Sequence, residues 1–291
     1  MTLTARWIDS SLFDTEEVVS AFDDLSLWSA PFGLALLDVI RMRGVRDVLD
    51  VGCGAGFPLI ELADRFGPRC RVAGVDPWKT AVERARAKAR TRGLPNVEVV
   101  LGRAEELPFP DAAFDLVVSN NGLNNVADMR RALAECARTS REGAQLVITA
   151  NLPLSMRELY DVYEAVLRDR GRGDLLPALA AHIDEKRKPV ETLVRWIEEA
   201  GYGDVVSHAH SFRMRFADGT ALFRHWFMRL GFVEPWANVL PQEEVEPVLD
   251  AIEERLNAIA ASEGEVSLTV PFACIEATRF SAVRRSGTAS G

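Results

Sequence analysis

Short apolar segments alternate with amphipathic ones between residues 45 and 150. Three amphipathic segments predict helices that end at or shortly before a glycine: 59–66, 80–91 and 128–139. Strands without a polar face that alternate with helices are typical of a parallel sheet covered on both sides. Five apolar segments rich in β-branched residues predict the strands of that sheet: 47–51, 71–75, 97–101, 115–119 and 145–150.

The pattern changes outside this block. Residues 15–44 predict two helices interrupted near Pro31, and the stretch from 151 to 188 predicts helices with long loops. Two segments that alternate in polarity predict further strands, at 205–216 and 266–280. Helices are expected between these strands and before them, at 190–200, 220–230 and 243–261.

Composition and charge exclude several classes of protein. The 291 residues are 48% hydrophobic and 26% charged, as in an ordinary globular protein. A net charge of −9 argues against general binding to nucleic acid or anionic membranes, and the basic run at 84–92 is interpreted as a solvated helix face. The four cysteines lack C-x-x-C spacing, and no secretory segment or apolar run of about 18 residues occurs. We expect a cytoplasmic protein without a membrane partner.

The most specific local feature is a glycine loop, V-L-D-V-G-C-G-A-G, which follows the first predicted strand. Glycines 52, 54 and 56 allow a nucleotide to approach the backbone. A dinucleotide fingerprint needs G-x-G-x-x-G, but the sixth position here is Phe57, which weakens an NAD or FAD site. Asp76 ends the second strand, where a carboxylate can accept both ribose hydroxyls. Asp50 is a polar residue in an apolar strand, either functional or a cap for the loop amides.

The ordered series of motifs resembles the class I S-adenosylmethionine-dependent methyltransferases. D-V-G-C-G-A-G and G-V-D-P-W are similar to their first two motifs, and G-R-A-E-E-L-P-F is similar to their adenine-contacting segment. F-D-L-V-V-S-N-N is similar to their fourth strand and the turn after it, and R-E-G-A-Q-L is similar to the turn before their fifth strand. The match covers residues 45–150 well and the flanks only by the order of their elements.

The resemblance implies an α/β fold: a doubly wound, mostly parallel, seven-stranded sheet whose last strand is antiparallel. It also implies a helical N-terminal cap over 1–44, a Rossmann-like S-adenosylmethionine-binding core over 45–150, and the rest of the sheet with helical lid insertions over 151–283. The polar tail, 284–291, is expected to be disordered.

The same resemblance assigns the cofactor contacts. The loop from Asp50 to Gly56 would hold the methionine part and Asp76 the ribose, with the other residues around the adenine or the amino-acid end. Many relatives carry an acid where this chain has Arg103, so the resemblance leaves Glu105 as the candidate for the bond to the adenine amine. The predicted cofactor-binding residues are Trp28, Asp50, Gly52, Cys53, Gly54, Gly56, Asp76, Pro77, Trp78, Arg103, Ala104, Glu105 and Asn120.

Candidate catalytic residues come from an amide-rich turn and from the histidines. Methyl transfer from a sulfonium mainly needs positioning and exclusion of water, and only a weakly nucleophilic acceptor needs a base. Asn121 and Asn124 could orient an acceptor or could simply serve the turn beside Gly122. His210 and His225 are the candidate bases. Nothing indicates a metal, because His208 and His210 have no third ligand at suitable spacing.

The sequence thus predicts an S-adenosylmethionine-dependent methyltransferase that acts on a small molecule, with neither nucleic acid nor membrane as partner. A homodimer is compatible with it. Two alternatives stay open: a quinone or polyketide-type C-methyltransferase, and a regulatory protein that binds S-adenosylmethionine without turnover. A nicotinamide oxidoreductase fits less well because of the glycine spacing.

Overall fold

The computed structural model describes residues 27–280. The first predicted helix of the N-terminal cap and the tail at 284–291 lie outside the described residues. The chain divides into two compact units, and the described part of one comprises residues 27–150, 189–210 and 272–280. The other comprises 151–188 and 211–271. Strands β6 and β7 each begin in one unit and end in the other.

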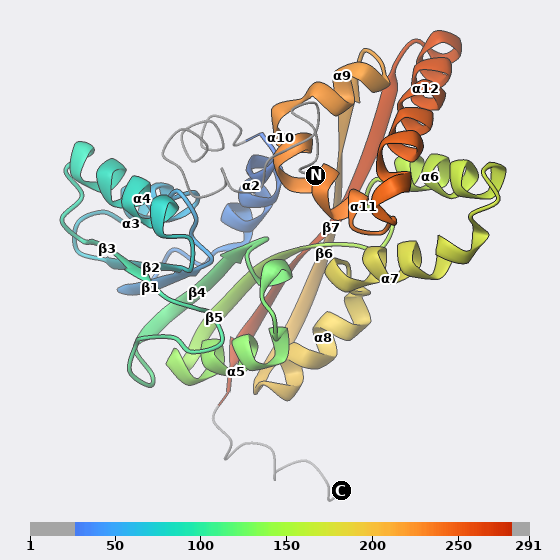
Figure 1. Cartoon of the computed structure of the whole chain (residues 1–291). Helices are drawn as coiled ribbons and strands as arrows, with labels where there is room; N and C mark the ends of the chain where they lie inside the picture. Colours follow the sequence, from blue (N-terminus) through green and yellow to red (C-terminus); the bar gives the residue numbers. More distant parts are fainter. Residues whose placement is uncertain (1–26, 281–291) are drawn as a thin grey trace, which may run out of the picture. The chain divides into compact units, whose positions relative to one another are not determined.

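One seven-stranded sheet runs through the fold in the order β3-β2-β1-β4-β5-β7-β6. Strands β1 to β5 are parallel and β7 is antiparallel to its neighbours, which confirms the predicted α/β fold (Figure 1). The strand bounds are β1 Asp47–Val51, β2 Arg71–Asp76, β3 Val97–Leu101, β4 Phe114–Asn120, β5 Ser140–Asn151, β6 Tyr202–Phe216 and β7 Val266–Arg279.

The strand order places a switch point between β1 and β4, from which the connections run outward in both directions. In open α/β sheets, ligands bind beyond the carboxyl ends of the strands at such a point. Asp50 lies level with Gly74 of β2 and Val118 of β4 in the parallel register. Asp76 and Asn120 therefore end strands on either side of β1.

Helices cover the sheet as their apolar faces require. Helices α2, α3 and α4 lie over one face, and α5 and α8 lie under the other (Figure 1). Pro31 stands in the first turn of α2, where a missing N–H is tolerated, so it accompanies the start of this helix. The bounds are α2 Ser29–Val39, α3 Leu59–Phe66, α4 Lys79–Thr91, α5 Met129–Thr139 and α8 Val190–Glu199.

The second unit, residues 151–188 and 211–271, consists mainly of helices and is called the helical unit. Trp236, Tyr160 and Tyr163 are among its fully buried side chains, and α12 packs against both α6 and α9. The bounds are α6 Arg157–Asp169, η3 Gly173–Leu175, α7 Leu176–Lys186, α9 Gly219–Arg224, α10 Trp226–Met228, η4 Arg229–Val233, α11 Glu234–Ala237, η5 Gln242–Glu244 and α12 Val245–Glu263.

One predicted helix, 220–230, is wrong as a single element. His225 has an extended backbone (φ −62°, ψ 125°), which no helix can continue through, and this separates α9 from α10. The chain then passes through the π-helical segment η4 before α11. Within residues 27–280, no helix has the length and apolar character that crossing a bilayer demands.

Candidate functional site

The glycine loop follows β1 and turns sharply because all three glycines have positive φ, at +78°, +49° and +105°. A Cβ on Gly52 would lie 2.9 Å from the Gly122 Cα atom, and one on Gly56 would lie 3.1 Å from Ile60 Cγ1. At Gly52 and Gly56 the neighbouring atoms therefore lie too close to leave room for a side chain. A Cβ on Gly54 would meet nothing within 4 Å, so this glycine leaves the backbone open to a ligand.

Asp50 is fully buried at the end of β1, and neither oxygen of its carboxyl has a hydrogen-bond partner among the described residues. Burial, together with the nearby charge of Asp76, raises the pKa of Asp50 to about 8. The Leu59 backbone N–H opposes this shift, although it makes no hydrogen bond of good geometry. A buried carboxyl without partners is costly, and a cationic ligand would relieve that cost.

Asp76 ends β2 and connects the glycine loop to the residue that precedes α4. One carboxylate oxygen accepts the Gly54 N–H and the other accepts the Trp78 N–H, each at 2.8 Å. Burial raises the pKa of Asp76, and the two N–H groups oppose the shift. A carboxylate oxygen has two lone pairs, so each oxygen can still accept a hydroxyl group from a ligand.

Trp78 precedes α4 and packs against Ala55 of the glycine loop and Ala81 of α4. Its ring is half-buried, whereas Pro77 is exposed. Trp78 therefore lies beside the glycine loop, and its contact with an adenine stays a prediction. Packing and ligand contact are compatible here, because one face of an indole ring can serve each purpose.

The turn after β3 places the residues predicted to meet an adenine edge. Ala104 is buried, and Arg103 forms a single antiparallel bridge with Glu106. The Glu105 carboxylate accepts the Ala127 N–H at 2.9 Å and the Asp128 N–H at 3.4 Å. Burial works to raise the pKa of Glu105, but backbone N–H groups and the Arg103 charge outweigh it and lower the pKa.

Glu105 thus links this turn to the loop that follows β4. The Arg103 guanidinium lies 3.6 Å from the Glu105 carboxylate, and the arginine side chain is 66% exposed. The departure from the family pattern at Arg103 is explained as an exposed ion-pair partner of Glu105. Surface pairs of this kind contribute little to stability.

Helix α2 reaches the end of β4 through Asn120. The Asn120 side chain donates to the Ser29 carbonyl at 3.2 Å and accepts from the Thr149 hydroxyl at 3.1 Å. A Cβ on Gly33 would lie 2.3 Å from the Phe57 ring, so α2 approaches the glycine loop closely. The predicted residue Trp28 stands just before this helix, and its ring lies 5.5 Å from that of Phe32.

In the amide-rich turn, Asn121 forms hydrogen bonds with its neighbours in the turn and with Thr149. Asn121 has φ +60°, which asparagine tolerates better than most residues. Its side-chain oxygen accepts from the Asn124 amide, its backbone N–H donates to the Thr149 hydroxyl, and its carbonyl accepts from Asn125. The bond between the two side chains joins Asn121 to Asn124.

Asn121→Gly is expected to lower the free energy of unfolding by about 1 kcal/mol, because glycine accepts positive φ freely but the side-chain bond to Asn124 is lost. Asn121→Val is expected to cost about 2 kcal/mol, because a β-branched residue at this φ is strained and the side-chain bond is lost. Urea unfolding of both variants measures the difference. Equal stability of the two would show that φ at this position is not constrained.

The two candidate histidines belong to different units. His210 is exposed on β6 and stacks on the Phe272 ring with centroids 5.1 Å apart, in the same unit as the glycine loop. His225 lies in the helical unit, where burial lowers its pKa. Its Nδ1 atom is buried without a described hydrogen-bond partner, and its ring meets Phe216 edge-on.

Three polar residues of the site were not foreseen. The Ser119 hydroxyl donates to the Val51 carbonyl at 2.7 Å and accepts the Leu123 N–H at 3.1 Å. Thr149 orients Asn120 and Asn121, and Ser29 supplies the carbonyl that Asn120 binds. Ser119 and Thr149 are the small polar residues near the ends of two apolar strands, which was the available signal.

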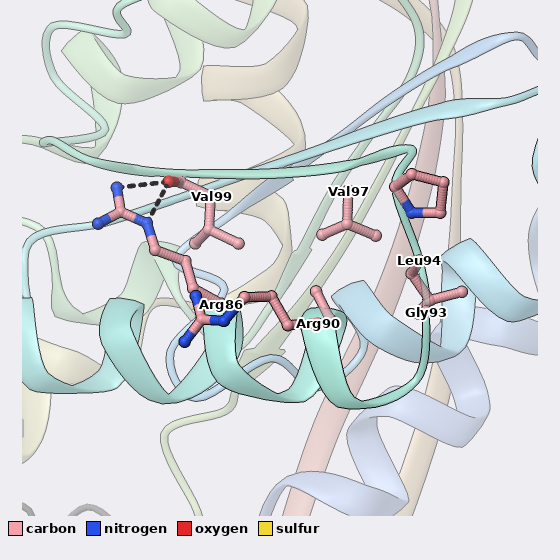
Figure 2. Close-up of a pocket in the computed structure, with 8 residues that line it drawn as sticks. Arg86, Arg90, Gly93, Leu94, Val97 and Val99 are labelled. Atoms are coloured by element: carbon pink, nitrogen blue, oxygen red, sulfur yellow. Dashed lines mark hydrogen bonds between the residues drawn. The ribbon is translucent and has the colours of Figure 1, made fainter.

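A separate groove lies along the outer edge of the sheet, between α4 and β3 (Figure 2). Its volume is about 570 Å³, and it includes part of the basic run, with Arg86 and Arg90 at its rim. The Arg86 guanidinium donates twice to the Val99 carbonyl, at 3.0 and 2.7 Å. The groove contains neither Asp50 nor Asp76, so we do not place the predicted cofactor there.

Comparison with known proteins agrees with this geometry. Residues 49–148 match a family model described as the methyltransferase domain. This segment of the chain is a methyltransferase domain. The matched segment of this domain begins in β1 and ends in β5, so it contains the glycine loop, Asp76, the turn after β3 and the asparagine turn.

Among curated relatives, the demethylmenaquinone methyltransferase of Listeria welshimeri is 38% identical over 110 residues, which are 38% of this chain and 47% of that protein. The chain spans about half the length of the curated relatives it matches.

Solved structures share the fold over much more of the chain. A putative methyltransferase from Bacillus halodurans has a TM-score of 0.57 at 21% identity, covering 86% of this chain and 99% of that one. A phosphoethanolamine N-methyltransferase from Haemonchus contortus, in complex with S-adenosylhomocysteine, has a TM-score of 0.57 at 16% identity. That match covers 94% of this chain and 59% of that one.

Proposed function

We propose that this protein transfers a methyl group from S-adenosylmethionine to a small-molecule acceptor. The observation that carries the proposal is the Asp50 carboxyl, which is buried without a partner beneath a glycine loop that is open at Gly54. A cationic nucleoside fits this pair of features. Support also comes from the Haemonchus contortus enzyme of the same fold, which was solved with S-adenosylhomocysteine.

The glycine loop and the residues around it would each contact a different part of the cofactor. Asp50 would neutralise the positive charge at the amino-acid end, and the backbone at Gly54 would lie against the ligand. Asp76 would accept the ribose hydroxyls while it holds the Gly54 and Trp78 N–H groups. Pro77, Trp78 and Ala104 would border the adenine.

S-adenosylmethionine supplies a methyl group on a sulfonium, which makes the leaving group neutral. The acceptor atom forms a bond to the methyl carbon as the carbon–sulfur bond breaks, and a proton of the acceptor passes to a base or to water. Asn121 and Asn124 would shape the wall beside the acceptor. His210 and His225 are the proposed proton acceptors for an acceptor group that must lose a proton.

A quinone-like acceptor methylated on carbon is the second candidate. It is favoured by the 38% identity to the demethylmenaquinone methyltransferase of Listeria welshimeri.

We propose a cytoplasmic location as well, because all four cysteines are buried and unpaired, as in proteins of reducing compartments. The net charge of −9 supports a partner other than nucleic acid. The homodimer stays a prediction.

Two measurements test the proposed function. Calorimetric titration should show one S-adenosylmethionine site, and incubation with fractionated cell extract should form S-adenosylhomocysteine in some fractions, followed by mass identification of the product. Binding without turnover in every fraction would favour the non-catalytic regulatory protein. An absence of binding would contradict the whole proposal.

A further inference from the structure

The helical unit contains a buried polar cluster that the proposed reaction does not use. It joins Tyr160 of α6, His182 of α7, Trp236 of α11 and Arg187, the residue directly after α7. These elements belong to one unit of the chain, and Figure 1 shows α6, α7 and α11 within it.

Arg187 is only 5% exposed, although it carries a permanent positive charge. One Nη atom donates to the Tyr160 hydroxyl at 2.9 Å, and the other makes a long 3.4 Å bond to the Ile183 carbonyl. The Nε–H is buried and has no hydrogen-bond partner within the described chain. Two of the five N–H groups are thus used, and no ion pair with Arg187 occurs among the described residues.

The Tyr160 hydroxyl is held by three groups. The Arg187 guanidinium and the Trp236 indole N–H can only donate, so the Tyr160 oxygen accepts from both. Its own proton is then directed to His182 Nε2, 3.2 Å away, which must act as the acceptor. Tyr160 therefore has no lone pair left to stabilise Arg187 further, and it fixes the direction of the guanidinium.

The Arg187 guanidinium carbon lies 5.1 Å from the centre of the Tyr160 ring, a cation–π contact, but no residue of this cluster supplies a compensating negative charge. The carbonyls at the end of α7 carry only a partial negative charge, and Lys188 also uses one of them, at Asp184. A buried cation with one partner missing is strongly unfavourable, whereas the same cation paired with an oxyanion in two parallel bonds is stable. The Nε–H and a free N–H on a neighbouring Nη atom present the arrangement that carboxylates and phosphates bind.

We propose that Arg187 binds an oxyanion, the carboxylate or phosphate group of a small ligand, with Tyr160 as the residue that positions it. The proposal does not depend on the proposed function, because the residues that would hold the oxyanion all lie within the helical unit.

The test is calorimetric titration of the full chain with sodium phosphate and, separately, with sodium acetate, at constant ionic strength and without S-adenosylmethionine. The wild type should bind at least one of the anions at a single saturable site with a Kd of about 1 mM or below. Arg187→Met should weaken this binding at least about 10-fold, because a charged bidentate contact is lost. Binding of phosphate alone or of acetate alone identifies the ligand group.

Arg255→Met is the matched control, since Arg255 is an arginine of the same unit that is 42% exposed and pairs with Asp169. It should bind the anion as the wild type does. Arg187→Lys keeps the charge and should fold even if Arg187→Met does not, with weakened but measurable binding. Wild-type protein that binds neither anion saturably, or both Arg187 variants binding as tightly as the wild type, would overturn the proposal.

A separate measurement keeps this proposal distinct from the proposed function. S-adenosylmethionine affinity should be the same in the wild type and Arg187→Met. The anion titration alone decides the Arg187 site, and S-adenosylmethionine binding with turnover decides the proposed function.

Discussion

Asp50→Asn is expected to weaken S-adenosylmethionine binding by about 10- to 100-fold, because a charged contact to the ligand is replaced by a neutral one. The same change should make the ligand-free protein more stable near neutral pH. Near neutral pH the unfolded chain ionises this buried carboxyl and folding must return its proton, whereas asparagine of the same shape is neutral in both states. Calorimetry measures the first effect and urea unfolding measures the second.

The pH dependence follows from the pKa of Asp50, which rises from 3.8 to about 8 on folding. Between these values the folded state holds a proton that the unfolded state has lost, so this group lowers stability as pH rises. The contribution is at most about 1.4 kcal/mol per pH unit over that window, and it should be absent from Asp50→Asn. Above about pH 8, no further change arises from this carboxyl.

Ligand binding should release a proton for the same reason. A cation beside Asp50 favours the ionised carboxyl and lowers its pKa, so titration near pH 7 should release up to about one proton per site. Calorimetry in buffers of different ionisation enthalpy detects this release. Asp64→Asn, at an exposed residue of α3, is the matched control and should behave as the wild type. If Asp50→Asn binds as tightly as this control, Asp50 does not contact the ligand.

Gly54→Ala is expected to weaken S-adenosylmethionine binding at least about 10-fold, because the added Cβ would occupy the space in which the ligand meets the backbone. The folded chain itself has room for this atom, since nothing lies within 4 Å of it. The loss should therefore appear mainly in binding, with a backbone cost of about 1 kcal/mol in stability from φ +49°.

Gly93→Ala separates these two effects. Gly93 follows α4, has φ +65° and likewise has nothing within 4 Å of an added Cβ. Its backbone cost should match that of Gly54→Ala, whereas its ligand affinity should equal that of the wild type. Equal affinities in all three proteins would mean that the ligand does not approach the loop at Gly54.

Much of the parallel part of the sheet could be predicted because its strands are short, mainly apolar segments. The strand at 97–101 and the helix at 59–66 match β3 and α3, since apolar runs and glycine stops determine both locally. Strand β5 begins at Ser140, five residues before the predicted 145, because Ser140 pairs with Phe114 of β4, and an irregularity in register separates this pair from the next one, Gln145 with Leu116. Pairing of this kind depends on the neighbouring strand and is invisible in the segment itself.

The site shows the same division. Asp50 and the glycine loop were identifiable because a carboxyl and three glycines interrupt an otherwise apolar pattern. The hydrogen bonds that the Glu105 carboxylate accepts could not be identified from the sequence, because their donors are the backbone N–H groups of residues 127 and 128, far along the chain from the turn after β3. Arg187 lies within the charged run E-K-R-K, which is typical of a solvated segment, and only tertiary packing buries it.

Arg86 has a further consequence at the edge of the sheet. Strand β3 is an outer strand, so its free carbonyls could pair with a strand of a second molecule. At Val99 the guanidinium of Arg86 already takes this place with two hydrogen bonds. A foreign strand would have to displace a charged side chain in the middle of β3, which disfavours sheet-to-sheet aggregation there. A homodimer of this chain would accordingly be expected to form through another surface.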